Sequence, residues 1–203
     1  LGISDGGFAY IMSEKPLRTL GDLKGQKVWT PEGDVLTAAM FESAGISPIP
    51  LPVADVYTGL QTGLLDTVAG IPTGIIAFQW YTSVTYLTDV PLMFLSGMLT
   101  IDSKAFGRIK AGDQEIVRAV MGDIFSKLDE VNRADNESAR AALQNQGIEF
   151  VQPDAAERDN WEWIAKQGRE QLISRAKYTP ALVDEMLGHI RAYRSRHGGG
   201  DSE

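Results

Sequence analysis

The chain has 203 residues, of which 43% are hydrophobic and 23% charged, the proportions of an ordinary globular protein. Its formal net charge of −8 argues against a nucleic-acid partner, because phosphate backbones attract basic surfaces. The sequence contains no cysteine, which excludes disulfides and thiolate metal sites, and no apolar run approaches the roughly 20 residues that a membrane-spanning helix needs.

Short strands and helices alternate over the first third of the chain. In chain order the pattern predicts strands over residues 8–12, 27–29, 49–51 and 67–69. Between them it predicts a helical turn capped by Thr19, a helix that Gly45 stops, and a helix over residues 54–62. This alternation is typical of βαβ units, so we expect a mainly parallel sheet.

The chain changes character after residue 101. Up to that point we expect a helix over residues 75–80 and a long or bent strand between 84 and 101. Beyond it, apolar residues recur at three- and four-residue steps from 113 to 146, which predicts one helix about 50 Å long. A strand near 148–151 and two further helices, at 155–175 and 180–194, complete the predicted elements.

Catalytic and metal-binding motifs are not evident. The two histidines, His189 and His197, are too far apart in sequence to predict a metal pair, and the nucleophile-elbow, zinc-protease and P-loop patterns do not occur. The acidic pairs Glu32/Asp34 and Asp55/Asp66 allow acid–base chemistry, but Asp22, Asp55 and Glu32 are more simply explained as residues at helix starts, where the helix dipole favours acidic side chains. We therefore expect no enzyme, no cofactor and no metal.

Aromatic residues gather at turns that follow the predicted strands. They are Trp29, Tyr57, Trp80, Tyr81 and Phe94. Ligands of open parallel α/β sheets sit beyond the carboxyl ends of the strands, so these rings are candidate ligand contacts, and packing in the core is the alternative. Trp161 and Trp163 lie two apart in a predicted helix, so we expect one to be packed and the other to lie at an edge.

Several motifs, in a fixed order, resemble those of a known family. They are DLKGQKVWTP at residues 22–31, AGISPIP at 44–50, DVYTGLQTGLLDT at 55–67, YLTD at 86–89 and DQEIV at 113–117. Their order and spacing from about residue 7 to 195 resemble the DctP-type solute-binding subunits of tripartite ATP-independent periplasmic (TRAP) transporters.

The resemblance implies a periplasmic receptor that captures a small molecule and delivers it to a membrane permease. It also implies a periplasmic-binding-protein-like α/β fold, of which this chain carries the second lobe but not the amino-terminal lobe or a signal peptide. On that basis residues 7–101 form a solute-binding lobe, 102–196 a connector helix with carboxyl-terminal helices left from the other lobe, and 197–203 a disordered tail.

The chain departs from the family at its ligand-binding positions. By the resemblance, the family's two carboxylate-binding arginines align with Trp29 and Ala9, and the asparagine of its Q-E-N-P turn falls near Gly70, before Pro72 and Thr73. A tryptophan offers an aromatic face instead of a bidentate clamp. The predicted ligand contacts are therefore Ala9, Trp29, Glu32, Asp34, Tyr57, Gly70, Pro72, Thr73, Trp80 and Phe94.

The sequence leaves two main functions open, and an enzyme that uses Glu32, Asp34 or Asp66 is a minor third alternative. The first is a solute receptor with an altered pocket, which the acidic residues Glu32 and Asp34 would bias toward cationic or neutral solutes. The second is a receptor-derived module that binds no solute and acts through homo-oligomer or domain-exchange contacts, because helices without their lobe would expose apolar faces.

Overall fold

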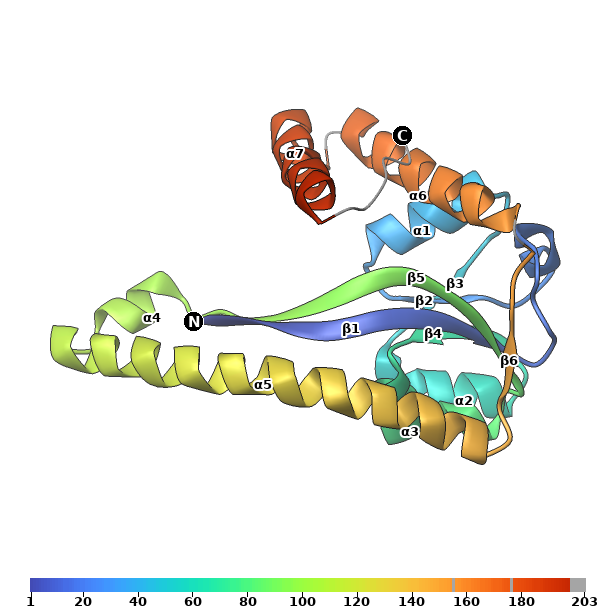
Figure 1. Ribbon diagram of the computed structural model, residues 1–203, viewed down its shortest axis with the longest axis horizontal. Helices are drawn as coiled ribbons and strands as arrows, with labels where there is room; N and C mark the ends of the chain where they lie inside the picture. Colours follow the sequence, from blue (N-terminus) through green and yellow to red (C-terminus); the bar gives the residue numbers. More distant parts are fainter. Residues whose placement is uncertain (155, 176, 198–203) are drawn as a thin grey trace.

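A computed structural model describes residues 1–154, 156–175 and 177–197 of the chain (Figure 1). A four-stranded sheet in the order β4-β1-β5-β6 is flanked by helices on both sides. The expected tail at residues 197–203 lies outside the described residues, except for His197 at the end of α7.

The sheet is mixed, so the expectation of a mainly parallel sheet is wrong. β1 (Gly2–Ser13) runs antiparallel to both β4 (Thr67–Gly70) and β5 (Tyr86–Leu99), and only β6 (Glu149–Val151) lies parallel to its neighbour β5. Alternation of strands and helices predicts crossovers, but it carries no information on the direction of β1, which precedes the first helix.

The expected parallel βαβ unit does form at the edge of this sheet. β2 (Trp29–Pro31) and β3 (Ile49–Leu51) pair in parallel and are joined by α1 (Val35–Ser43). A single parallel bridge from Val28 to Thr67 connects the unit to β4. Prediction from local pattern therefore succeeded where consecutive strands were joined by a helix.

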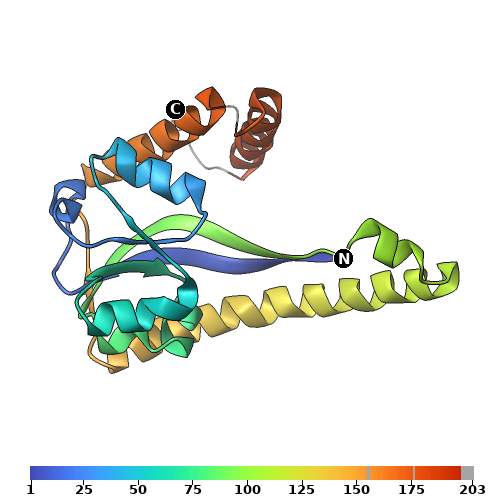
Figure 2. The same ribbon diagram turned by 180° about the vertical axis from the view of Figure 1, so that it is seen from behind.

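Helices occupy both sides of the sheet. α1 and α6 (Glu157–Ser174) lie on one side, and α2 (Val56–Gln61), α3 (Pro72–Ala77) and α5 (Ala111–Asn145) lie on the other (Figure 1, Figure 2). The long apolar repeat correctly predicted α5 as a single long helix, and in the structure it runs along the length of β1 and β5. It is preceded by α4 (Ser103–Gly107), which the sequence did not predict. α7 (Pro180–Arg196) follows last.

Alternating side chains of β1 divide the hydrophobic core in two. Met12 belongs to a cluster with Trp29, Trp80 and Leu143 on the α5 side. Ile11 belongs to a second cluster on the α1 and α6 side, whose other members include Phe41, Trp161 and Ile164. Trp161 is 8% exposed and Trp163 49% exposed, which confirms that only one of the two tryptophans is packed.

Three short helical turns complete the structure, at Leu20–Leu23, Val53–Asp55 and Trp80–Thr82. The first has the predicted capping box, in which the Thr19 side chain accepts from the Asp22 backbone N–H and the Asp22 carboxylate accepts from that of Thr19. The backbone N–H groups of Thr19 and Arg18 both donate to the Asp22 carboxylate. These two hydrogen bonds, of which that from Thr19 has the larger effect, lower the pKa of Asp22. Sequence patterns identified this turn because its hydrogen bonds are local.

Replacing Gly168 by alanine tests the contact between α6 and α1. An alanine β-carbon at this position would lie 2.6 Å from Cγ of Met40 and 3.0 Å from its backbone nitrogen, so α6 would have to move away from α1. We expect Gly168→Ala to lower the free energy of unfolding by about 1–3 kcal/mol, as overpacking does, in urea denaturation.

Gly188→Ala in α7 is the matched control. No heavy atom lies within 4 Å of the β-carbon it would add, so the substitution gains helix propensity and should raise the free energy of unfolding by up to about 1 kcal/mol. A Gly168→Ala protein as stable as the control would contradict the described packing of α6 on α1.

Candidate functional site

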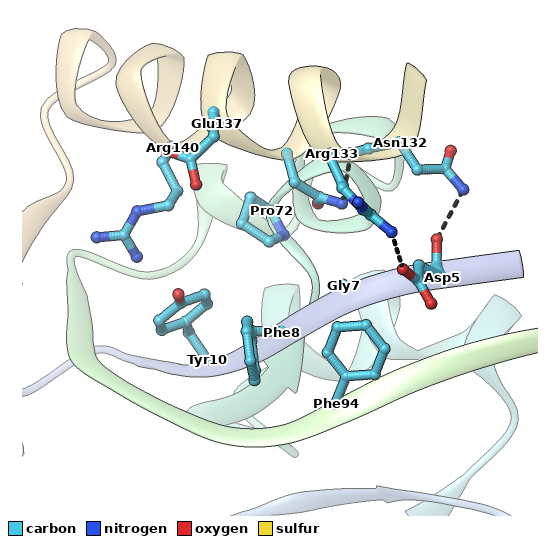
Figure 3. Close-up of a pocket in the computed structure, with 11 residues that line it drawn as sticks. Asp5, Gly7, Phe8, Tyr10, Pro72, Phe94, Asn132, Arg133, Glu137 and Arg140 are labelled. Carbon is cyan, nitrogen blue, oxygen red and sulfur yellow. Dashed lines mark hydrogen bonds and ion pairs between the residues drawn. The ribbon is translucent and has the colours of Figure 1, made fainter. Parts of the chain in front are cut away.

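A cavity of about 330 Å³ lies between α5 and the strand pair β1–β5 (Figure 3). Its volume is at the lower end of the range of about 300–1,000 Å³ for small-molecule pockets. Its lining comes from β1, β5, the start of α3 and one face of α5, and comprises Asp5, Gly7, Phe8, Tyr10, Pro72, Phe94, Asn132, Arg133, Asn136, Glu137 and Arg140.

The strand side of the cavity is mostly aromatic. Strand alternation directs Phe8 and Tyr10 toward α5 while Ala9 between them is buried, at 2% exposure, outside the lining. Phe8 packs edge to face against Phe94 with ring centroids 5.0 Å apart, and about half of each side chain stays exposed, 50% and 47%. The two rings therefore form an open apolar floor.

Gly7 permits the close approach of β1 to α5. Its φ of +113° is a conformation that other residues rarely adopt, and a β-carbon there would lie 2.7 Å from Nδ2 of Asn136. The register of β1 against β5 shifts between Asp5 and Gly7, so the strand bulges at this point.

Polar side chains of α5 form the opposite wall because they recur at helical spacing. Asn132, Asn136 and Arg140 lie four residues apart and therefore share one face of the helix. Asn132 Nδ2 donates to the backbone oxygen of Asp5 at 2.8 Å. Asn136 Nδ2 donates to the backbone oxygen of Gly6 at 2.8 Å, and its Oδ1 accepts from Thr73 Oγ1 at 3.1 Å.

Arg140 is held from three sides. Its Nη2 lies 2.8 Å from Oδ1 of Asp89, and its guanidinium lies 4.7 Å from the ring centroid of Tyr10 and 4.9 Å from that of Phe150. Burial lowers the pKa of Arg140, but the hydrogen bond and charge of Asp89 outweigh it, so the net pKa lies above its usual value. Its Nη1 is buried and has no hydrogen-bond partner in the described part of the chain.

The second arginine of the cavity is more exposed. Arg133 Nη2 pairs with Oδ2 of Asp5 at 2.8 Å, and 72% of the Arg133 side chain is accessible. The hydrogen bond and charge of Asp5 raise the pKa of Arg133. This pair closes one end of the cavity rather than offering a free charge.

Three of the predicted contacts lie at this cavity. Pro72 and Phe94 line it. Thr73 lies behind the wall, where it bonds to Asn136 through both its backbone N–H, at 3.4 Å, and its hydroxyl.

The tryptophans of the predicted set pack together in the core. Trp29 is 5% exposed, its Nε1 donates to the backbone oxygen of Leu51 at 3.0 Å, and its ring centroid lies 5.2 Å from that of Trp80. Gly70 lies against Trp80, since a β-carbon on it would be 3.4 Å from that ring. None of these three residues lines the cavity.

The remaining predicted contacts lie elsewhere. Asp34 caps α1, with its Oδ1 accepting from the backbone N–H groups of Leu36 and Thr37 at 3.1 Å each. Glu32 is exposed beside it, and Tyr57 is partly exposed on α2. The structure thus brings together only part of the predicted set.

The sequence did not point to most of the cavity wall. The residues missed are Asp5, Gly7, Phe8, Tyr10, Asn132, Arg133, Asn136, Glu137 and Arg140. One usable signal was present, because the asparagines and arginine at 132, 136 and 140 interrupt the apolar repeat of the long helix on a single face. Among the described residues no cluster of three potential metal ligands occurs, and none of the described helices is long and apolar enough to cross a bilayer.

Comparison with known proteins gives a consistent result. Residues 1–174 match the family model DctP, described as bacterial extracellular solute-binding protein, family 7. The chain is 46% identical over 54 residues to the 2,3-diketo-L-gulonate-binding periplasmic protein YiaO of Escherichia coli, covering 27% of this chain and 16% of that protein. It is 23% identical over 176 residues to the C4-dicarboxylate-binding periplasmic protein DctP of Rhodobacter capsulatus, covering 86% of this chain and 53% of the relative.

The fold has solved counterparts. A TRAP periplasmic solute-binding protein of Haemophilus influenzae with bound L-gulonate superposes with a TM-score of 0.85 at 21% identity, covering 93% of this chain and 62% of that one. The chain therefore spans less than two thirds of each of these proteins.

Replacing Arg140 tests the electrostatics of the cavity wall. Arg140→Met keeps much of the apolar stem but leaves the Asp89 carboxylate partly buried without its cation. We expect a loss of about 2 kcal/mol or more in the free energy of unfolding, measured by urea denaturation. Arg133→Met, which breaks the exposed pair with Asp5, is the control and should have a much smaller effect. An equal loss of unfolding free energy in the two variants would contradict the distinction between a partly buried and an exposed ion pair.

Proposed function

The chain belongs to the DctP family of bacterial extracellular solute-binding proteins, and from this we propose that it binds a small-molecule solute for a TRAP-type uptake transporter. The family consists of transport receptors rather than enzymes, and homologues of the chain are periplasmic binding proteins. The receptor would act in the periplasm and deliver its solute to the membrane permease subunits of the transporter.

The cavity between β1 and α5 is the observation that carries this proposal. It combines an open aromatic floor, Phe8 with Phe94, with polar groups of α5 on the opposite wall. Such a mixture suits a small molecule with both apolar and polar parts. We infer that this cavity contributes to the solute site, with Pro72 and Phe94 as direct contacts.

We also propose that the usual carboxylate-binding arginine is replaced by Trp29. Trp29 is buried, donates a hydrogen bond to Leu51 and packs on Trp80. These contacts favour a structural role for Trp29 beneath the site rather than direct binding of an anion. The remaining candidate contacts, Ala9, Glu32, Asp34, Tyr57, Gly70, Thr73 and Trp80, would then shape or flank the site.

The division of the chain follows from the same proposal. Residues 7–101 would form a solute-binding lobe, and residues 102–196 would be the connector helix and carboxyl-terminal helices left from the other lobe. The length of α5, which runs beside β1 and β5 from the α2–α3 region to α4, supports a connecting role for this helix (Figure 1).

A thermal-shift screen of the 203-residue chain tests the receptor function. Carboxylates, amines, zwitterions and polyols are the solute classes, and binding at one hundred times the dissociation constant stabilises the native state by about 2.7 kcal/mol. We expect a clear rise in melting temperature with at least one class and its loss in Phe94→Ser. Leu64→Ser, which alters a similarly exposed apolar residue outside the cavity, should keep the shift. A shift retained in Phe94→Ser would contradict the assignment of the site.

A second candidate function is favoured by exposed apolar stripes. On α5, Ile116, Val120, Ile124, Leu128 and Val131 recur along one face and are 39–61% exposed. A second stripe on α7 is 40–65% exposed and comprises Leu182, Met186, Ile190 and Tyr193. Such faces usually find a partner, so we propose, as the alternative, a receptor-derived module that self-associates or exchanges domains and binds no solute.

Light scattering distinguishes this alternative from the receptor. A self-associating module would be dimeric, would become monomeric in Ile124→Glu, and would show no thermal shift with any solute class. Ser126→Glu, which adds the same charge at an exposed position of α5 away from the apolar stripe, is the control and should leave the mass unchanged. A monomeric wild-type chain would eliminate the alternative.

A further inference from the structure

The more buried arginine of the cavity, Arg140, is closed to a ligand. Its Nη2 lies 2.8 Å from Oδ1 of Asp89, its guanidinium packs against the rings of Tyr10 and Phe150, and its Nη1 is buried. Figure 3 shows this guanidinium turned away from the aromatic floor of the cavity. A solute carboxylate on that floor would therefore find no donor in Arg140.

Arg133, on the same wall of the cavity, is surrounded by acidic groups. Its Nη2 lies 2.8 Å from Oδ2 of Asp5. This hydrogen bond is the main cause that raises the pKa of Arg133, and the charges of Asp129 and Glu130 raise it further. One guanidinium is thus opposed by three carboxylates, so the potential near Arg133 does not favour an additional anion.

Glu137 is the acidic residue of the lining that makes no ion pair with any described residue. It lies on α5 about one turn before Arg140, and its side chain extends from the helix toward the cavity beside Pro72 (Figure 3). The charge of Arg140 does not cancel that of Glu137, because Asp89 already balances it. When Asp89 is counted with the lining, the formal charge around the cavity is negative, since three acidic residues oppose two arginines.

The strand side of the cavity complements a cation with an apolar body. Phe8 and Phe94 pack edge to face and leave about half of each side chain exposed. Such rings bury the hydrocarbon part of a ligand, and their negative faces also attract an ammonium group. The floor and the charge of Glu137 therefore favour the same kind of solute.

We propose that the cavity binds a small organic cation, namely a primary amine with an aromatic or other apolar body. Its ammonium group contacts the carboxylate of Glu137, and its apolar body lies on Phe8 and Phe94. This assignment rests on the proposed function and narrows it to one class of solute.

Three compounds with the same phenyl body and different charges test the assignment. At neutral pH 2-phenylethylamine is a cation, 2-phenylethanol is neutral and 3-phenylpropionate is an anion. By isothermal titration calorimetry on the 203-residue chain, we expect the amine to bind about five- to tenfold more tightly than the alcohol, because a charged contact at a partly open site is worth more than an exposed ion pair and less than a buried one. The anion should bind more weakly than the alcohol. An alcohol or an anion that binds as tightly as the amine would overturn the proposal.

Salt provides a second measurement on the unmodified chain. Raising the sodium chloride concentration from about 0.02 M to about 0.5 M should remove most of the preference for the amine over the alcohol, because salt screens a partly open ion pair. The affinity of the alcohol should not fall. A preference for the amine that does not change with salt would show that charge does not cause it and would contradict the proposal.

The role of Glu137 is tested by its amide. Glu137→Gln should lower the affinity for 2-phenylethylamine to that for 2-phenylethanol and leave the affinity for the alcohol unchanged. Asp135→Asn is the control, because it removes a negative charge from an exposed position outside the lining, two residues from Glu137 and therefore on a different face of α5. It should keep the preference for the amine. A Glu137→Gln protein that also keeps this preference would overturn the assignment.

Failure here is distinguishable from failure of the receptor function. If none of the three phenyl compounds binds while another solute class gives a Phe94-dependent thermal shift, the assignment of an organic cation is wrong and the receptor function stands. If no solute class gives any shift, both fail.

Discussion

Three side chains of α5 satisfy the backbone of β1 where its pairing with β5 is interrupted. At the bulge, Asp129 Oδ1 accepts from the Asp5 N–H at 2.8 Å, and Asn132 and Asn136 donate to the carbonyl oxygens of Asp5 and Gly6. The hydrogen bond from the Asp5 backbone is the main cause that lowers the pKa of Asp129. Backbone polar groups outside the ladder need such partners, so these contacts fix the position of α5 along β1.

The cavity follows from this attachment. Because α5 is held at the bulge, the next turn of the helix carries Glu137 and Arg140 past Tyr10, while Phe8 and Phe94 face the helix from the strands. Arg140 is stacked between aromatic rings and paired with Asp89, so its guanidinium has a defined position before any solute arrives.

Sequence patterns predicted what depends on neighbouring residues. The capped turn after Thr19 and the length of α5 are set by local hydrogen bonds and apolar spacing, and the structure contains both. The direction of β1 depends on its pairing with β4 and β5, over separations such as that between Ser13 and Thr67 or between Gly2 and Leu99. The contact between α5 and β1 joins residues still farther apart, such as Asn136 and Gly6. Motif comparison directed attention to Trp29 and Ala9, whereas the polar wall of the cavity comes from residues 132–140 of α5, beyond the DQEIV motif at the start of that helix.

The position of a bound solute is the most direct test of this description. A crystal structure of the chain grown with the solute that gives the largest thermal shift would locate it. We predict electron density between β1 and α5, against Phe8 and Phe94. A solute bound at the turn beside Trp29, away from α5, would contradict the assignment of this cavity as the binding site.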